Sequence, residues 1–232
     1  MNVEIWSDIA CPWCAVGKRR FEKALEQFEH ADDVTVTFRS FELDPDAPAA
    51  RAGSTAENLA KKYGTSLEQA LAMNQRMTET AAEDGLTFRF DIAKGGNTFD
   101  AHRLLHLAAA HGRQLELKER LMRAYLGEGE LMSDHEALTR LALEAGLDED
   151  EVRDTLATDR FADAVREDEA TASGLGISAV PFFVIDRKYG ISGAQPAELF
   201  SEALNQAWQE ANPLIPVGAS DAEACGPDGC SI

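Results

Sequence analysis

Residues 6–21 read WSDIACPWCAVGKRRF, and this stretch decides the fold. It contains Cys11 and Cys14, with only Pro12 and Trp13 between them. Two cysteines at this spacing can hold a metal ion, form an inert disulfide or exchange electrons with other thiols. The residues on either side of the pair distinguish these uses.

The elements around the cysteine pair are readable from their periodicity. Residues 3–6 predict a short strand before the pair, and residues 34–38 alternate apolar and polar side chains as a second strand does. Between them, apolar residues recur at the i, i+3, i+4, i+7 spacing of one helix face. These residues are Phe21, Ala24, Leu25 and Phe28. A strand, a helix and a strand in this order favour parallel pairing of the two strands.

The start of this helix predicts different roles for the two thiols. With Cys11 as the N-cap, Pro12 takes the first helical position, where a missing N–H costs nothing. The backbone N–H of Cys14 is then expected to point at the Cys11 sulfur. The helix N-terminus stabilises a thiolate there by about 1 kcal/mol. We therefore predict that Cys11 attacks disulfides and that the shielded Cys14 resolves the mixed disulfide.

A zinc site is the alternative use of the pair. It needs four ligands, usually from a second pair of Cys or His residues. The other cysteines, Cys225 and Cys230, lie in a Gly- and Pro-rich tail, while His102 and His106 share one helix face, which is typical of a polar surface. The sequence therefore favours a redox pair, and we expect neither a metal nor another cofactor.

The rest of the chain is mostly helical until the strand patterns return. Residues 44–174 predict helices, with capping boxes at Ser66 with Gln69 and at Ser133 with Glu136. Within this segment, residues 86–90 alternate as a strand or an extended connection does.

Strand patterns follow at 181–186 and 189–192, and a helix is predicted from about 196 to 210. We thus expect a small α/β unit, 1–43 with 175–212, split by an all-helical insertion, 44–174. The Cys-containing tail, 213–232, is expected to be flexible.

Three polar residues near the ends of elements have structural interpretations. Asn97 is predicted to cap a helix that has Asp100 in its first turn. His102 is predicted to pack or to form hydrogen bonds, and Gln195 to mark the entry of the last helix.

The dipeptide Val180-Pro181 comes immediately before an apolar strand. Proline is accepted at the first residue of a strand. Its peptide bond is more often trans, but a cis bond would expose the backbone of Val180 for pairing with a substrate chain. The residues alone leave both isomers open.

Four motifs in this order resemble one known family. They are WSDIACPWC, FRSFELDP, NTFDAHRLLHLA and GISAVPFFVIDRKYGISGAQP. From residue 3 to about residue 208 the chain resembles the thioredoxin-fold DsbA-like oxidoreductases, and most of all their cytoplasmic FrnE-like branch. That branch is related to the 2-hydroxychromene-2-carboxylate isomerases and the kappa-class glutathione transferases. The resemblance implies a thioredoxin fold interrupted by the helical insertion, and a cis bond that brings Pro181 to face the cysteine pair.

The same resemblance implies a thiol-disulfide oxidoreductase, acting on protein or small-molecule thiols and disulfides. Cys11 and Cys14 would be catalytic, and the substrate-binding residues would be Pro12, Trp13, Val180 and Pro181. The related isomerases and transferases typically carry serine where this chain has Cys11, which favours dithiol chemistry. Whether it works as an oxidase, an isomerase or a reductase stays open.

Three further hypotheses remain beside this one. Glutathione can serve as reductant or mixed-disulfide partner, or the protein can be a glutathione-dependent isomerase or transferase of a small organic substrate. It can also be a peptide-binding or chaperone module with an idle cysteine pair. In the tail, the Pro-Asp-Gly turn signal makes Cys225 and Cys230 a candidate second redox pair. Two incidental thiols of a mobile tail and a metal clip are the alternatives.

The composition narrows the partners and the compartment. The 232 residues carry a net charge of −19, with 41 acidic against 22 basic residues, which argues against nucleic acid and anionic membranes as partners. The sequence contains no run of 18 apolar residues, so it predicts no membrane-spanning helix. The N-terminus lacks the basic start and apolar core of a signal peptide, so we expect the cytoplasm, where structural disulfides are rare.

Overall fold

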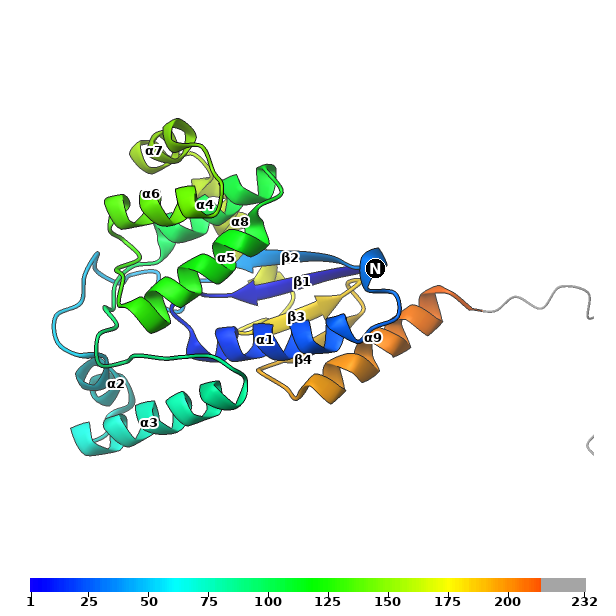
Figure 1. The fold of residues 1–232 in the computed structure, drawn as a ribbon, viewed down its shortest axis with the longest axis horizontal. Coiled ribbons are helices and arrows are strands. Elements are labelled where there is room, and N and C mark those ends of the chain that lie inside the picture. Colours follow the sequence, from blue (N-terminus) through cyan, green and yellow to red (C-terminus); the bar gives the residue numbers. More distant parts are fainter. Residues whose placement is uncertain (214–232) are drawn as a thin grey trace, which may run out of the picture.

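A four-stranded sheet forms the centre of the protein in a computed structural model, which describes residues 1–213 (Figure 1). Its strands are β1 (Asn2–Ser7), β2 (Thr35–Ser40), β3 (Phe182–Ile185) and β4 (Tyr189–Ser192). Their order across the sheet is β2-β1-β3-β4, with β1 and β2 parallel and the other neighbours antiparallel. The predicted parallel strand-helix-strand unit is thus confirmed.

The described residues contain nine α-helices. They are α1 (Pro12–Glu26), α2 (Thr55–Tyr63), α3 (Leu67–Glu83), α4 (Phe99–Ala110), α5 (Gln114–Arg123), α6 (His135–Glu144), α7 (Glu149–Ala157), α8 (Ala162–Gly174) and α9 (Ala197–Ala211). A short 3-10 helix spans Ala31–Asp33, and a π-helical turn spans Ala124–Glu128. The segment between β2 and β3 contains α2 to α8 and no strand, which confirms an α/β fold with a helical insertion.

The two faces of the sheet pack against different helices because side chains alternate along each strand. Val3 and Ile5 belong to a buried cluster with residues of α1 and α9, which lie side by side along the sheet in Figure 1. In this cluster the Phe21 and Phe200 rings each contact Phe183, with centroids 5.6 and 4.6 Å away. Trp6, on the opposite face, is fully buried in a cluster with residues of α8 and of the segment that follows it.

The inserted helices share a core with the start of α1. One buried cluster joins Ile9, Cys14 and Val16 to apolar side chains of α4, α5 and α6. The segment around the cysteine pair therefore lies at the junction between the sheet unit and the insertion.

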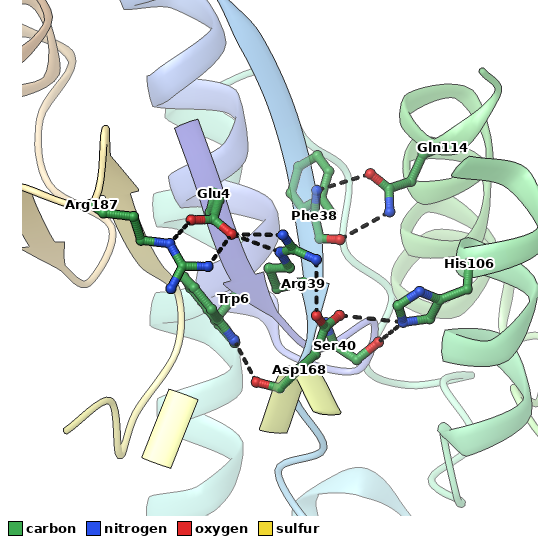
Figure 2. A network of polar contacts seen from close by, with 9 residues as sticks. All are labelled: Glu4, Trp6, Phe38, Arg39, Ser40, His106, Gln114, Asp168 and Arg187. Atoms are coloured by element: carbon green, nitrogen blue, oxygen red, sulfur yellow. Dashed lines mark hydrogen bonds and ion pairs between the residues drawn. The ribbon is translucent and has the colours of Figure 1, made fainter. Parts of the chain in front are cut away.

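Polar side chains cover the free edge of β2 (Figure 2). The side-chain amide of Gln114 accepts a hydrogen bond from the Phe38 N–H and donates one to the Phe38 carbonyl, both at 2.9 Å. Two residues further along β2, the Asp168 carboxylate accepts a hydrogen bond from the Ser40 N–H at 2.8 Å. An edge strand otherwise leaves such groups unpaired. These bonds attach α5 and α8 to the sheet in one register.

Helix starts were predicted with mixed success. The capping box of Ser66 with Gln69 is confirmed. The predicted box at Ser133 is wrong, because Asp134 is the N-cap of α6 and accepts the backbone N–H groups of residues 136 and 137. The Ser133 hydroxyl donates instead to the Ala49 carbonyl. An aspartate one residue later satisfies the same helix N–H groups.

Two other local predictions need correction or refinement. The N-cap of α4 is Thr98 rather than Asn97, although the Asn97 side chain does accept the Phe99 N–H at 2.8 Å. Residues 86–90 form a connection and not a strand. In the part of the chain described, their backbone N–H groups make two isolated bonds to other segments, from Leu86 to the Ala81 carbonyl of α3 and from Arg89 to the Leu126 carbonyl.

Replacing Gln114 by leucine tests the attachment of α5. In Gln114→Leu, the Phe38 N–H and carbonyl lose their partners, which we expect to lower the free energy of unfolding by about 2–4 kcal/mol. Urea denaturation followed by circular dichroism measures this loss. The matched control is Gln75→Leu, an exposed residue of α3, which should cost less than about 0.5 kcal/mol. Equal losses in the two variants would contradict this account of the β2 edge.

Candidate functional site

The cysteine pair occupies the first turn of α1, as predicted. Cys11 is the N-cap with extended backbone angles, φ −92° and ψ 110°, and Pro12 follows at the first helical position. Both thiols are free and buried, with 4% of Cys11 and 1% of Cys14 exposed. Trp13, between them, is 47% exposed. The pair thus presents an aromatic surface beside a nearly enclosed sulfur.

The Cys11 sulfur contacts a polar group from a distant segment of the chain. The thiol donates to the carbonyl of Val180, with Sγ and O 3.8 Å apart. The Val180–Pro181 peptide bond is cis, which confirms the expectation drawn from the family resemblance. The predicted contact between the Cys14 N–H and the Cys11 sulfur is wrong, since that N–H donates to the Cys11 carbonyl at 3.0 Å. The side chain of Cys11 is directed to the proline segment, Val180–Pro181, instead of back over its own helix.

Close packing at Gly17 brings α1 against the proline segment. A Cβ atom at Gly17 would lie 2.9 Å from the Pro181 ring and 3.4 Å from the Cα and Cβ of Ala194. Only glycine permits this approach without movement of one of the two segments. Gly17 therefore sets how near Pro181 lies to the start of α1.

A buried carboxylate lies in the connection from β1 to the cysteine pair. Asp8 is 2% exposed and accepts the Leu43 N–H at 2.8 Å and the Ala10 N–H at 3.3 Å. Burial opposes its ionisation, but the contacts with His102 and the Leu43 N–H outweigh burial and bring the pKa of Asp8 below its usual value. Asp8 thus holds the loop that follows β2 against the loop that carries Cys11.

His102 lies fully buried beside Asp8. Its Nε2 is 3.4 Å from an Asp8 carboxylate oxygen, and neither ring nitrogen has a hydrogen-bond partner in the described structure. Burial lowers the pKa of His102, although Asp8 acts in the opposite direction. Burial thus disfavours the charged imidazole, and the ring packs against the Asp8 carboxylate.

Lys118 of α5 is a buried charge that sequence reasoning missed. Its side chain is fully buried, and its ammonium donates to the carbonyl of Ser7, the last residue of β1, at 3.1 Å. Burial lowers the pKa of Lys118 to about 8, while the thiol of Cys14 and the carboxylate of Asp8 act against this shift. Lys118 sits between Leu117 and Leu121 on the apolar stripe of α5, and a lysine at such a position was the signal that could have identified it.

Burial raises the pKa of the Cys14 thiol, whereas it lowers the pKa of Lys118. It raises the pKa of Cys14 well above its usual value, and the neighbouring Cys11 raises it further, whereas Lys118 opposes both effects. At neutral pH Cys14 is therefore a thiol, which fits a group that reacts only after another step has changed its surroundings.

A second buried carboxylate lies in the loop after β2. The side chain of Glu42 is inaccessible, and an Arg166 nitrogen approaches one of its oxygens to 2.6 Å. Burial raises the pKa of Glu42 to about 7, more than the pairing with Arg166 lowers it, and Glu169 and Asp8 add to the rise. This loop also holds Leu43, which binds Asp8, so the charge of Glu42 bears on the surroundings of the site.

The described residues, 1–213, contain no group of three or more His, Cys, Asp or Glu side chains placed to hold a metal ion. No helix within the same residues is both long and apolar enough to cross a membrane. Gln195, predicted at the entry of the last helix, lies just before the N-cap Pro196 of α9. The cysteines of the tail, Cys225 and Cys230, lie outside the described residues.

Comparison with known proteins places this arrangement in a family. The DSBA-like thioredoxin domain matches the chain from residue 2 to residue 205. The chain belongs to this family. This confirms the resemblance seen in the four motifs, and it makes the protein an oxidoreductase or isomerase of the DsbA-like thiol oxidoreductase class.

Two relatives and one protein that shares the fold illustrate these comparisons. The crystal structure of a probable DsbA oxidoreductase from Streptomyces coelicolor is 52% identical, with a TM-score of 0.87, and the match covers 100% of this chain and 99% of that one. The uncharacterized protein YwbO of Bacillus subtilis is 29% identical, over 88% of this chain and 96% of its own length. The cytosolic disulfide reductase DsbM of Pseudomonas aeruginosa, solved with glutathione, is 16% identical and shares the fold, with a TM-score of 0.63 over 89% of this chain and 98% of its own.

Substitution of Gly17 tests the contact between α1 and the proline segment. Alanine normally stabilises a helix interior, but in Gly17→Ala the new methyl group meets the Pro181 ring, so we expect a loss of about 1–3 kcal/mol. The control is Gly174→Ala in α8, where a Cβ meets no atom within 4 Å. That change should be neutral or add up to about 1 kcal/mol. Chemical denaturation of both variants gives the comparison, and a Gly17→Ala protein as stable as Gly174→Ala would refute the close contact.

The raised pKa of Glu42 predicts a pH-dependent stability. Between pH 4.5 and about 7 the unfolded chain loses the Glu42 proton while the folded protein keeps it, so stability falls as the pH rises through this range. Relative to Glu42→Gln, which cannot ionise, the wild type should lose up to about 3 kcal/mol between pH 4.5 and pH 8. Urea unfolding at both pH values measures the difference.

The control for this experiment is Glu136→Gln, because Glu136 also pairs with an arginine but is 78% exposed. Between pH 4.5 and pH 8, Glu136→Gln should not gain stability relative to the wild type, as Glu42→Gln is expected to do. A Glu42→Gln protein whose relative stability is constant from pH 4.5 to pH 8 would show that Glu42 titrates normally.

Proposed function

We propose that this protein is a thiol-disulfide oxidoreductase that exchanges disulfides through the Cys11-Pro12-Trp13-Cys14 pair. The observation that carries the proposal is the position of Cys11 at the N-cap of α1, with its sulfur 3.8 Å from the carbonyl that precedes the cis-proline. A helix N-terminus favours a thiolate at this position. The adjoining backbone of Val180 offers a substrate chain hydrogen-bonding groups beside the reacting sulfur.

The reaction would use the two thiols in turn. The Cys11 thiolate attacks one sulfur of a substrate disulfide and releases the other as a thiolate. Cys14 then loses its proton and attacks the Cys11 sulfur, which closes the Cys11–Cys14 disulfide and frees the second substrate thiol. The substrate disulfide gains two electrons and the protein dithiol loses two. The high pKa of Cys14 supports this order, because only Cys11 is then available for the first attack.

The residues beside the sulfurs suggest the kind of substrate. Trp13 is half exposed, Val180 is partly buried, and Pro181 lies against Gly17 at the start of α1. We assign Pro12, Trp13, Val180 and Pro181 to substrate binding, with protein or small-molecule thiols and disulfides as partners. Glutathione is included because DsbM, which shares the fold, was solved with it. The cytosolic description of DsbM likewise supports a cytoplasmic site of action.

Selective alkylation tests the assignment of the two thiols. Iodoacetamide in limiting amount near pH 6 should label Cys11 before Cys14, since burial keeps Cys14 protonated. Mass spectrometry of the digested protein locates the label. Cys11→Ser should abolish dithiol-dependent reduction of insulin, whereas Cys14→Ser should accumulate a mixed disulfide at Cys11 with insulin or glutathione.

Other results would favour the alternative functions. Preferential labelling of Cys14 would reverse the two roles. Turnover of a small organic substrate with glutathione that survives in Cys14→Ser would indicate an isomerase or transferase. Peptide binding that is unchanged in the double variant Cys11→Ser, Cys14→Ser, together with no disulfide exchange by the wild type, would indicate a binding or chaperone module. The pairing of Cys225 with Cys230 remains a prediction from the sequence.

A further inference from the structure

Lys118 is a buried cation that forms no ion pair with a carboxylate of the described residues. Its side chain is fully buried, its one hydrogen bond goes to the Ser7 carbonyl, and no carboxylate oxygen of the described residues lies within 4.0 Å of its ammonium. Lys18, 5% exposed, differs in this respect, because Glu22 and Glu119 lie 2.6 and 2.5 Å from its nitrogen. Burying an ammonium without a counter-charge is costly. A negative charge that forms beside Lys118 during the reaction would therefore be stabilised by its ammonium.

Lys118 lies beside the segment that carries the cysteines. Cys11 and Cys14 share one buried cluster with Leu117 and Leu121 of α5, and the Lys118 ammonium reaches the carbonyl at the end of β1, just before this segment. The electrostatic neighbours of Lys118 are Cys14, Asp8, Cys11 and Lys18, of which Cys14 has the largest effect. The neighbours of Cys14 include Lys118 and Cys11. Asp8 is the only one of these groups whose charge is permanently negative, and it is already engaged by the Leu43 and Ala10 N–H groups. Cys11 carries no charge once it is bound in the mixed disulfide. At that stage the thiolate of Cys14 is the remaining negative charge that can form beside the ammonium.

The fold holds the ammonium under the cysteine pair. Gln114, one turn earlier on the same face of α5, is fixed to Phe38 by two hydrogen bonds of 2.9 Å, as Figure 2 shows. The Lys118 nitrogen lies 5.3 Å from the centroid of the Phe38 ring and reaches the end of β1. There the Ser7 hydroxyl is buried without a hydrogen-bond partner among the described residues. The cation thus comes from the inserted helices and reaches the base of the loop that carries Cys11 and Cys14.

We propose that Lys118 is a positioning residue for the resolving step, in which its ammonium stabilises the Cys14 thiolate. This inference rests on the proposed disulfide exchange. As Cys14 loses its proton, its sulfur attacks the Cys11 sulfur of the mixed disulfide. The Cys11–Cys14 bond forms and the bond from Cys11 to the substrate sulfur breaks, so the departing thiolate takes up a proton in place of the one that Cys14 lost. With a pKa of about 8, Lys118 is mainly protonated at pH 7, and it transfers no proton in this step.

The proposal gives the helical insertion a part in the chemistry. The sheet unit supplies both cysteines and the cis-proline, but the charge that favours the second thiolate comes from α5. A positive charge fixed beside the pair also favours the reduced protein over the disulfide form, because only the reduced form contains a thiolate.

Stopped-flow reaction with Ellman's reagent, 5,5′-dithiobis(2-nitrobenzoate), measures the resolving step directly. Attack by Cys11 releases one nitrothiobenzoate ion, and attack by Cys14 on the mixed disulfide releases the second, so the second phase at 412 nm reports resolution. In Lys118→Met the pH midpoint of this phase should rise by at least about one unit, with a rate at pH 7 about tenfold lower. Methionine keeps the length of the side chain and removes a buried charge, so this variant is expected to fold.

Two further variants complete the test. Lys18→Met removes an equally buried lysine of α1 and should leave the midpoint where the wild type has it. Lys118→Arg keeps the positive charge and should return the midpoint most of the way. A folded Lys118→Met protein with an unchanged midpoint, or Lys18→Met with the same rise, would overturn the role of Lys118. If the wild type itself shows no second phase, the proposed exchange through Cys11 and Cys14 fails and not this inference alone.

Discussion

The contact between Gly17 and Pro181 is the constraint on which the site depends. It joins a helix near the N-terminus to a segment more than 160 residues later in the chain. Because a Cβ at Gly17 would already be too close to the Pro181 ring, α1 lies nearer to this proline than any residue other than glycine would permit without a shift. The Val180 carbonyl consequently comes within reach of the Cys11 sulfur. A reactive thiol and a backbone edge for substrate are thereby combined in a site that neither segment forms alone.

The inserted helices are held to the sheet by directional polar contacts as well as by apolar packing. In Figure 2, Glu4 on β1 pairs with both Arg39 and Arg187, and Arg39 also pairs with Asp168 of α8. The backbone carbonyl of Asp168 accepts the Trp6 indole N–H at 2.9 Å. Buried ion pairs often add little net stability, but their geometry excludes other arrangements. This network, with Gln114 on α5, defines where the insertion sits relative to the cysteine pair.

Burial affects the ionisable groups near the cysteines in different ways, according to what each of them contacts. Asp8 remains ionised because His102 and a backbone N–H offset its desolvation, whereas Glu42, with an arginine as its main partner, does not recover its normal pKa. For Cys14, burial and the neighbouring Cys11 raise the pKa by more than Lys118 and the Ser7 side chain lower it. The same low-polarity environment therefore produces a carboxylate, a group that titrates near neutrality and a protected thiol within a short stretch of structure.

Local sequence patterns determined the elements of this protein, and tertiary packing determined the site. The strand before Cys11, the helix that begins at Pro12 and the second strand were predictable because periodicity and capping depend on residues close in the chain. The cis isomer at Val180–Pro181 was expected only from the family resemblance. The direction of the Cys11 side chain, the cap at Asp134 in place of Ser133 and the buried Lys118 were not predicted correctly. Each of these depends on groups brought together from separate segments: the Val180 carbonyl at Cys11, Ala49 at Ser133, and Ser7 at Lys118. Such contacts leave no periodic trace in the sequence, because the energies that select them exist only once the chain has folded.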